Sequence, residues 1–232
     1  MIQKVVMGTR LPAKLWLNEV EDNCMEQIVN LASLPFAFKH IAIMPDAHAG
    51  MGMPIGGVLA TKGVIVPNAV GVDIGCGMCA MKTNLKASEL ERKNITDVMR
   101  HIRKTIPLGF EHQKKAVDES LLPEVDWSTL PYLQDKRDNI LKEIGTLGGS
   151  NHFIEIQKDT QNDDVWVMIH SGSRHQGLRV ANHYNKLAEY WCEKWYAETL
   201  LGLAFLPMET KEAKDYMAEM NYCIQIAFAN RQ

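Results

Sequence analysis

The segment from Val70 to Cys79 has the composition of a metal-binding turn. Asp73 and Cys76 place a carboxylate and a thiol three residues apart, among glycines at positions 71, 75 and 77. Glycine adopts backbone angles closed to other residues and lets a ligand approach the chain closely. A carboxylate and a thiolate directed at one point suit a borderline divalent metal ion. The alternative is a structural turn between buried strands, in which Cys76 serves as a small apolar residue.

Two histidines supply further donors for this candidate site. His152 follows the sequence Gly-Gly-Ser-Asn, and His170 begins the sequence His-Ser-Gly-Ser-Arg. A carboxylate, a thiolate and two imidazoles suit zinc, manganese or iron(II) by the softness of their donor atoms. Each histidine also has a structural interpretation, since His152 could cap a strand and His170 could bond to a backbone carbonyl. Taken together, the four residues predict a metal site of Asp73, Cys76, His152 and His170.

Cys76 and Cys79 also form a Cys-x-x-Cys pair, which is the spacing of zinc ribbons and of thioredoxin-like redox sites. A zinc ribbon needs a second pair, but the other cysteines, at positions 24, 192 and 223, are isolated in helical sequence. A redox pair needs a helix directly after it, whereas residues 78–83 are typical of a strand. We therefore expect Cys79 to be a buried residue that binds nothing.

Asp46 and His48 follow an apolar run and are the remaining candidates for acid–base chemistry. They could move protons or orient the metal ligands through hydrogen bonds. Alternatively, they form part of a turn after a strand, which Pro45 would favour. The sequence predicts no firmer catalytic residue.

Two glycine- and serine-rich segments could bind phosphate. Asn151 and the residues before it could present amide donors, as successive N–H groups in turns often do. Ser171, Ser173 and Arg174 form the second segment, and arginine suits bidentate phosphate binding, although these residues could also cap the following helix. The common phosphate loops, GxGxxG before a helix and GxxxxGK(S/T), are absent from the sequence.

The segments that must position these residues alternate between strands and helices. Apolar periodicity predicts strands over 2–7, 40–44, 58–60, 64–66, 78–82, 152–157 and 165–169, and helices over 19–33, 87–106, 132–147, 179–201 and 209–230. The glycines and short β-branched runs between 49 and 83 favour tightly turned strands over a βαβ nucleotide fold. We predict an α+β fold in which a compact, glycine-rich β core carries the metal site and helices pack outside it.

Length and charge narrow the class of protein. The 232 residues can bury a substantial core, and the net charge of −3 means that any nucleic acid must bind a local basic patch. The N-terminus lacks an apolar signal core, and no apolar stretch is long enough to cross a bilayer. Five cysteines do not resemble a secreted disulfide framework. We expect a cytoplasmic protein with reduced thiols and no membrane partner.

Four segments carry a family resemblance: MPDAHAGMGMPIGGV, VGVDIGCGM, IGTLGGSNHFIEI and HSGSR. Together they resemble the RtcB-type RNA-splicing ligases, and they occur in the order of that family. The similarity extends from about His40 to the C-terminus. Four motifs in order are far more specific than any one of them, and the Asp-Ile-Gly-Cys-Gly-Met sequence is close to diagnostic.

The resemblance implies a GTP-dependent ligase with two manganese ions. Such an enzyme joins RNA that ends in a 3′-phosphate or a 2′,3′-cyclic phosphate to RNA with a 5′-hydroxyl. Carried over by motif, Asp73 and Cys76 would be metal ligands, with the Cys76 thiolate bridging both ions, and His152 and His170 would each hold a metal. The guanylate site would be lined by Asn151, His152, Phe153, Ile154 and Glu155, with Asn151 near the phosphate.

The chain also departs from the family's pattern. The family forms a covalent histidine–guanylate intermediate, and the accepting histidine lies in a C-terminal segment that this chain lacks. We therefore expect residues 1–232 to be a single RtcB-like domain without that segment, which alone binds metal imperfectly and accepts no guanylate. Two rival functions use the same donors: a metal-dependent phosphoesterase, and a non-catalytic metal- or RNA-binding relic.

Overall fold

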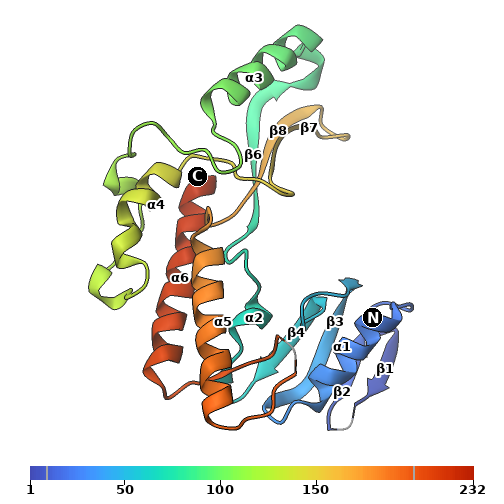
Figure 1. The fold of residues 1–232 in the computed structure, drawn as a ribbon. Helices are drawn as coiled ribbons and strands as arrows, with labels where there is room; N and C mark the ends of the chain where they lie inside the picture. Colours follow the sequence, from blue (N-terminus) through green and yellow to red (C-terminus); the bar gives the residue numbers. More distant parts are fainter. Residues whose placement is uncertain (9, 201) are drawn as a thin grey trace. The chain divides into compact units, whose positions relative to one another are not determined.

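The computed structural model describes residues 1–8, 10–200 and 202–232 and contains both helices and sheets, which confirms the α+β class (Figure 1). Its backbone separates into two compact units, described one at a time below. The first comprises Met1–Val72 and Ala181–Met217, and the second Asp73–Val180 and Ala218–Gln232. The single-domain organisation stays a prediction. Among the described residues, no helix has the length and apolarity needed to span a membrane.

A four-stranded sheet is the centre of the first unit, in the order β1-β2-β3-β4. Strands β2 and β3 are parallel, and the other neighbours are antiparallel. Helix α1 makes the connection between the parallel strands. The bounds are Lys4–Met7 (β1), Pro12–Leu15 (β2), Asp22–Ser33 (α1), Ala37–His48 (β3) and Ile55–Thr61 (β4).

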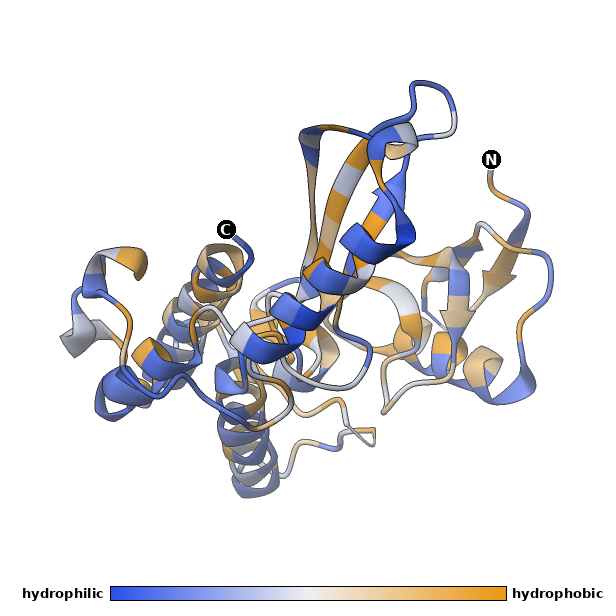
Figure 2. Cartoon of the chain, turned by 90° about the horizontal axis from the view of Figure 1, so that it is seen from above, coloured by the Kyte–Doolittle hydropathy of each residue, from blue (hydrophilic) through white to orange (hydrophobic). Residues whose placement is uncertain are grey.

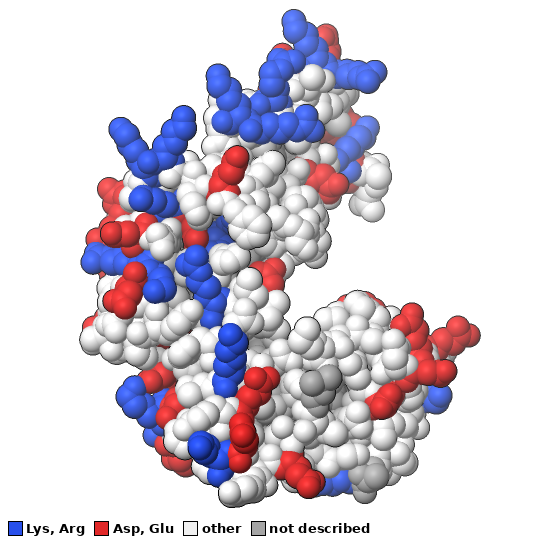
Figure 3. Space-filling model, viewed as in Figure 1, with Lys and Arg blue, Asp and Glu red and all other residues white. Residues whose placement is uncertain are grey.

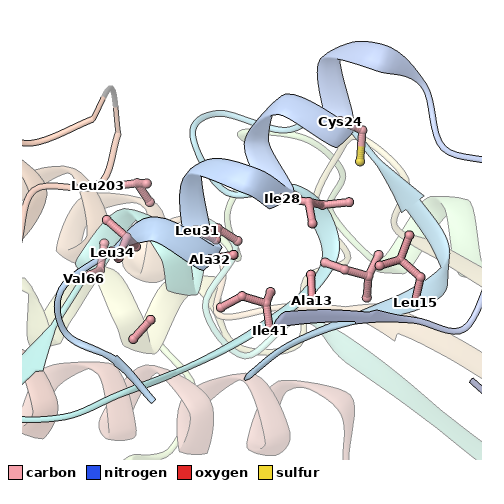
Figure 4. Packing of buried hydrophobic residues seen from close by; sticks show 12 residues of the cluster. Ala13, Leu15, Cys24, Ile28, Leu31, Ala32, Leu34, Ile41, Val66 and Leu203 are labelled. Atoms are coloured by element: carbon pink, nitrogen blue, oxygen red, sulfur yellow. The ribbon is translucent and has the colours of Figure 1, made fainter. Parts of the chain in front are cut away.

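The core of this unit lies between α1 and the sheet (Figure 4). Ile28 and Leu31 of α1 are fully buried, as are Leu15 and Ile41 of the facing strands. The helical spacing of the apolar residues in the sequence therefore identifies the buried face of α1 correctly. Burying each of these side chains contributes about 1.5–3 kcal/mol.

Strand β3 is longer than the sequence predicts. The apolar run indicates a strand that ends before Pro45, but β3 continues to His48. Its pairing with β4 shifts register between Ile43 and His48. A proline has no N–H to donate, so it is tolerated where the ladder is irregular. Asp46 and His48 consequently lie in a strand, and the interpretation as a turn after a strand is wrong.

The first unit also contains short elements and parts of two long helices. Strands β5 (Val64–Ile65) and β9 (Leu206–Pro207) form an antiparallel pair, and α2 (Pro67–Val70) follows β5. Helices α5 (Gln176–Lys194) and α6 (Lys211–Arg231) are each divided between the two units. The sequence predicts that α5 extends to Leu201, but the helix ends at Lys194 and residues 195–200 are not helical; Leu201 itself lies outside the described residues.

The second unit is built on a three-stranded antiparallel sheet in the order β6-β8-β7. Its strands are Gly77–Lys86 (β6), Phe153–Lys158 (β7) and Asp164–Ser171 (β8). Gly77 pairs with Ser171, and Phe153 pairs with His170. This register brings the start of β6, the start of β7 and the end of β8 together at one end of the sheet. The three strands of the glycine-rich region, β4, β5 and β6, thus belong to three different sheets, and β6 lies next to the candidate metal ligands.

The helices of the second unit are shorter than their predicted spans. Residues 87–106 divide into the 3₁₀ turn η1 (Ala87–Glu89) and helix α3 (Arg92–Thr105), with Glu91 as the N-cap of α3. Residues 132–147 divide into η4 (Gln134–Lys136) and α4 (Arg137–Glu143). Two further 3₁₀ turns, η2 (Glu119–Leu121) and η3 (Trp127–Thr129), precede them.

Candidate metal centre

A tight turn before β6 presents Asp73 and Cys76 on the same side. The N–H of Cys76 donates to the carbonyl oxygen of Asp73 at 3.0 Å. Gly75 has a φ of 84°, and a Cβ there would lie 2.7 Å from the Cβ of Ala227 on α6. Both the left-handed backbone and the close helix require glycine at this position. The glycine-rich composition therefore serves the geometry of the turn.

The four predicted metal ligands come together at one end of the β6-β8-β7 sheet. His152 Nε2 lies 3.1 Å from Asp73 Oδ2 and 3.7 Å from Cys76 Sγ. His170 Nε2 lies 2.9 Å from Cys76 Sγ. The donor atoms of Asp73, Cys76 and His152 all lie within 4.8 Å of one another. The Cys76 sulfur is thus close to both imidazoles.

Backbone carbonyls fix the orientation of both histidines. His152 Nδ1 lies 3.1 Å from the carbonyl oxygen of Leu147, and His170 Nδ1 lies 3.1 Å from that of Asn151. Because a carbonyl oxygen only accepts, Nδ1 of each ring is the donor in this bond, and Nε2 is the nitrogen that faces Asp73 and Cys76. Metal-ligating histidines use this arrangement. For His170 the predicted carbonyl bond is present, and it supports ligation as well.

The thiol of Cys76 is held in its protonated form when no cation is nearby. Burial raises its pKa to about 11, and the hydrogen bond and negative charge of Asp73 act in the same direction. The guanidinium of Arg231 opposes these effects. A divalent ion at this position would favour the thiolate much more strongly, because its charge is larger and it would bind the sulfur directly.

Two residues near the end of α6 link the segments that carry the ligands. Arg231 Nη1 donates to the carbonyl oxygens of Gly75, at 2.8 Å, and Ser171, at 2.7 Å. Asn230 Nδ2 donates to the carbonyl oxygen of Thr146 at 3.1 Å and to Ser171 Oγ at 3.0 Å. The sequence analysis missed both residues. Their polarity at the end of an apolar helix was the only available signal.

Arg174 is almost fully buried beside this cluster. Its Nε donates to Thr146 Oγ1 at 2.6 Å, and its Nη2 donates to the carbonyl oxygen of Gly109 at 3.0 Å. A Cβ on Gly148 would collide with Arg174 Nη1 and would lie 2.5 Å from His152 Nδ1. Burial lowers the pKa of Arg174, while the charges of Glu143 and Asp73 oppose that effect.

Ser171 and Ser173 use their hydroxyls for internal hydrogen bonds. Ser173 Oγ donates to the carbonyl oxygen of Ile74 at 2.6 Å and accepts from the N–H of Gly177 at 3.1 Å. Ser171 Oγ donates to the carbonyl oxygen of Leu147 at 2.8 Å. Both serines are buried. The bond from Gly177 to Ser173 supports the structural interpretation of a cap on the following helix, α5, whereas the hydroxyl of Ser171 bonds to residues outside that helix.

The predicted guanylate-site residues lie at the start of β7. Asn151 is exposed, and the ring of Phe153 packs 5.4 Å from that of His170. Glu155 is exposed and accepts a hydrogen bond from Gln157 at 2.7 Å. Because side chains alternate along a strand, Ile154 points away from the face that carries Phe153 and Glu155. The guanylate-binding role stays a prediction.

The remaining candidates, Asp46, His48 and Cys79, lie within strands. Asp46 and His48 belong to the first unit, where His48 Nδ1 lies 2.9 Å from the carbonyl oxygen of Asp46, and their acid–base role stays a prediction. Cys79 lies within β6 and is half-buried, so the expectation of a buried side chain is only partly met. A strand and not a helix follows Cys76, which argues against a thioredoxin-like pair.

Comparisons with known proteins point to one family. The model of the tRNA-splicing ligase RtcB family matches residues 27–138 and 124–232. The RNA-splicing ligase RtcB of Escherichia coli K12 is 38% identical over 95% of this chain and 58% of its own length. The tRNA-splicing ligase RtcB of Methanococcus maripaludis is 30% identical over 96% of this chain, and that of Thermococcus kodakarensis is 28% identical over 100%. The chain spans under three-fifths of each of these relatives, namely 58%, 57% and 59%.

Proposed function

Because this chain belongs to the RtcB family, we propose that the polypeptide as the cell produces it acts as an RNA ligase dependent on GTP and manganese, whereas residues 1–232 alone are expected to accept no guanylate. The reaction would join an RNA end with a 3′-phosphate or 2′,3′-cyclic phosphate to a 5′-hydroxyl end. The observation that carries the proposal is the cluster of the Asp73, Cys76 and His152 donor atoms within 4.8 Å of one another, with His170 Nε2 2.9 Å from the Cys76 sulfur. Their donor atoms come from three separate segments of the chain.

The donor set fits two metal ions that share the sulfur of Cys76. The donor atoms of Asp73 and His152 lie within 4.8 Å of that sulfur, and His170 Nε2 lies 2.9 Å from it. Both imidazoles direct Nε2 at the cluster, so their rings need no reorientation to bind. When bound, two divalent ions would neutralise phosphate charge and orient an in-line displacement at phosphorus.

The surrounding residues have positioning roles in this proposal. The carbonyl oxygens of Leu147 and Asn151 hold the two histidines in one tautomer. Arg231 keeps the turn at Gly75 in register with the end of β8 at Ser171. These contacts would hold the ligands in place before any substrate binds, which lowers the cost of ordering them later.

Two groups of residues would contact the substrates. Arg174 is fixed through Nε and Nη2, and no hydrogen bond among the described residues uses Nη1. We therefore assign Arg174 to the terminal phosphate of the RNA, since its guanidinium is held rigidly next to His152. The guanylate would contact the segment of Asn151, His152, Phe153, Ile154 and Glu155.

A sealing assay on the polypeptide as the cell produces it tests the proposed function. The substrates are one RNA with a 3′-phosphate and one with a 5′-hydroxyl, incubated with manganese with and without GTP. We expect a joined product only when GTP is present. Phosphate release without GTP would instead indicate a phosphoesterase, and binding without turnover would indicate a non-catalytic protein. Either result would contradict the ligase.

A further inference from the structure

Helix α3 carries a concentrated positive charge on one face. At 100° per residue, its basic side chains fall within about 120° of the helix circumference. These residues are all exposed, namely Arg92, Lys93, Arg100, Arg103 and Lys104. The helix contains a single acidic residue, Asp97, which pairs with Arg100. Figure 3 shows the lysines and arginines gathered over this part of the second unit.

The charge of this face is largely uncompensated. Among the described residues, no ion pair involves Arg92, Lys93, Arg103 or Lys104. The acidic residues just before the helix are committed to backbone groups: Glu89 accepts from the N–H of Lys86, and Glu91 caps the first turn of α3. Because the whole chain has a net charge of −3, this face stands out as a local basic patch.

The rest of α3 gives no sign of a buried role. No residue of the helix is buried, and it is mainly hydrophilic (Figure 2). Its apolar side chains, Ile95, Val98, Met99 and Ile102, lie opposite the basic face and include the exposed Ile95 and Val98. The basic face is thus presented outward on a helix that contributes little to the core.

Strand β6 sets the distance between this face and the metal centre. It runs from Gly77, next to the ligand Cys76, to Lys86, shortly before α3. At about 3.3 Å per residue, these ends are roughly 30 Å apart. That distance corresponds to about nine steps of a stacked, helical strand with a rise of roughly 3.4 Å per nucleotide. If the terminus of an RNA lies at the metal centre, the nucleotides about nine steps from that terminus can therefore reach α3.

We propose that the basic face of α3 binds the phosphate backbone of the RNA whose end is held at the metal centre. This inference rests on the proposed function. The face offers five cationic side chains and no Phe, Tyr or Trp on which a base could stack. Such a surface contacts phosphates without reading sequence. Charge complementarity favours RNA over a protein partner, which would use the opposite, apolar face.

Neutralising the face tests the inference. The variant carries Arg92→Gln, Lys93→Gln, Arg103→Gln and Lys104→Gln. Its matched control removes four exposed lysines of the first unit by Lys4→Gln, Lys62→Gln, Lys186→Gln and Lys214→Gln. Dissociation constants are measured for a 30-nucleotide and a 5-nucleotide RNA, both with a 3′-phosphate, over a range of salt concentrations.

The α3 variant should bind the long RNA on the order of tenfold more weakly than the wild type. The slope of its log association constant against log salt concentration should become smaller in magnitude by about 3, since four phosphate contacts are lost. The short RNA should bind unchanged, and the control should bind both RNAs as the wild type does. An unchanged long-RNA affinity, or an equal loss in the control, would overturn the role of α3. If even the wild type binds neither RNA, the proposed function fails as well.

A second measurement avoids variants altogether. Lysines of the unmodified protein are acetylated by a small reagent with each RNA present at saturation, and the modified positions are read by mass spectrometry. The long RNA should protect Lys93 and Lys104, and the short RNA should not. Full reactivity of both lysines under the long RNA would overturn the proposal and direct attention to a protein partner.

Discussion

The Nε2 atom of His170 lies 2.9 Å from the Sγ atom of Cys76, while Nδ1 of the same ring faces the carbonyl oxygen of Asn151 at 3.1 Å. One hydrogen bond thus fixes both the tautomer and the direction of the donor. His152 repeats the arrangement through Leu147. The two imidazoles approach one sulfur from different segments, His152 from just before β7 and His170 from β8, as would be expected if Cys76 lies between two metal ions.

Each histidine should hold a separate metal ion. His170→Ala should lose one of two ions and retain the other, because Asp73 and His152 remain close to Cys76. His152→Ala should lose the other ion. Elemental analysis after gel filtration gives the number of ions per chain. The matched control is His101→Ala on the exposed surface of α3, which should keep both ions. Full metal content in both ligand variants would contradict the assignment.

Removing Arg231 should weaken metal binding without removing a ligand. Arg231→Met frees the turn at Gly75 from the end of β8, so the affinity for manganese should fall about 10–100-fold, as for other residues that orient metal ligands. Competition with a chelator measures the affinity. Arg100→Met, at an exposed arginine of α3, is the control. Arg231→Lys should recover part of the loss; equal affinities in all three variants would show that Arg231 has no positioning role.

Metal affinity should depend steeply on pH above the titration range of histidine. With a pKa of about 11, the metal-free Cys76 thiol is protonated at pH 7.5–9, and binding must release that proton. The apparent affinity should therefore rise about tenfold per pH unit in this range. Chelator competition at several pH values provides the measurement. A flat profile would mean that the sulfur is not a ligand.

The same raised pKa predicts how stability changes with pH in the absence of metal. A thiol whose pKa in the folded protein exceeds its ordinary value of 9.0 stabilises the fold fully below pH 9. This contribution should be lost as the pH rises toward 11, so the free energy of unfolding should decrease over that interval. Urea titrations at several pH values measure the free energy of unfolding. Between pH 9 and 11 it should decrease more for the wild type than for Cys76→Ala, because the variant has no thiol at this position to ionise.

Gly75→Ala should be more destabilising than Gly71→Ala. Both glycines have a positive φ, 84° and 91°, so both variants incur backbone strain of about 1–3 kcal/mol. Only at position 75 would the new Cβ meet α6, 2.7 Å from Ala227, whereas nothing lies within 4 Å at position 71. The collision should add about 1–3 kcal/mol and shift the metal ligands. Thermal unfolding compares the two variants, and equal melting temperatures would contradict the packing argument.

The donor set could be predicted from the sequence because its chemistry is local. Asp73 and Cys76 share one turn, and each histidine borders a glycine- or serine-rich segment. Their convergence depends on strand register, in which Phe153 faces His170 and Gly77 faces Ser171. Residue types do not fix that register. The family resemblance supplied the information, since the order of the four motifs implies a common fold.

The residues that the sequence could not reveal act through backbone groups of distant segments. Arg231 bonds to carbonyl oxygens 156 and 60 residues away, and any residue type could offer those acceptors. On α6, whose helical span the sequence predicts, Ile224 is 44% exposed while its neighbour Cys223 is buried. The side of α6 that carries Cys223 and Ala227 faces the turn before β6, because Gly75 packs against both residues.

The most direct test of the metal centre compares the two cysteines of the Cys-x-x-Cys pair. Metal content per chain is measured for the wild type, Cys76→Ala and Cys79→Ala after loading with manganese. Cys76→Ala should abolish binding of both ions, because both would share its sulfur. Cys79→Ala should keep them and lose stability only through packing. Equal loss of metal in the two variants would contradict a centre built on Asp73, Cys76, His152 and His170.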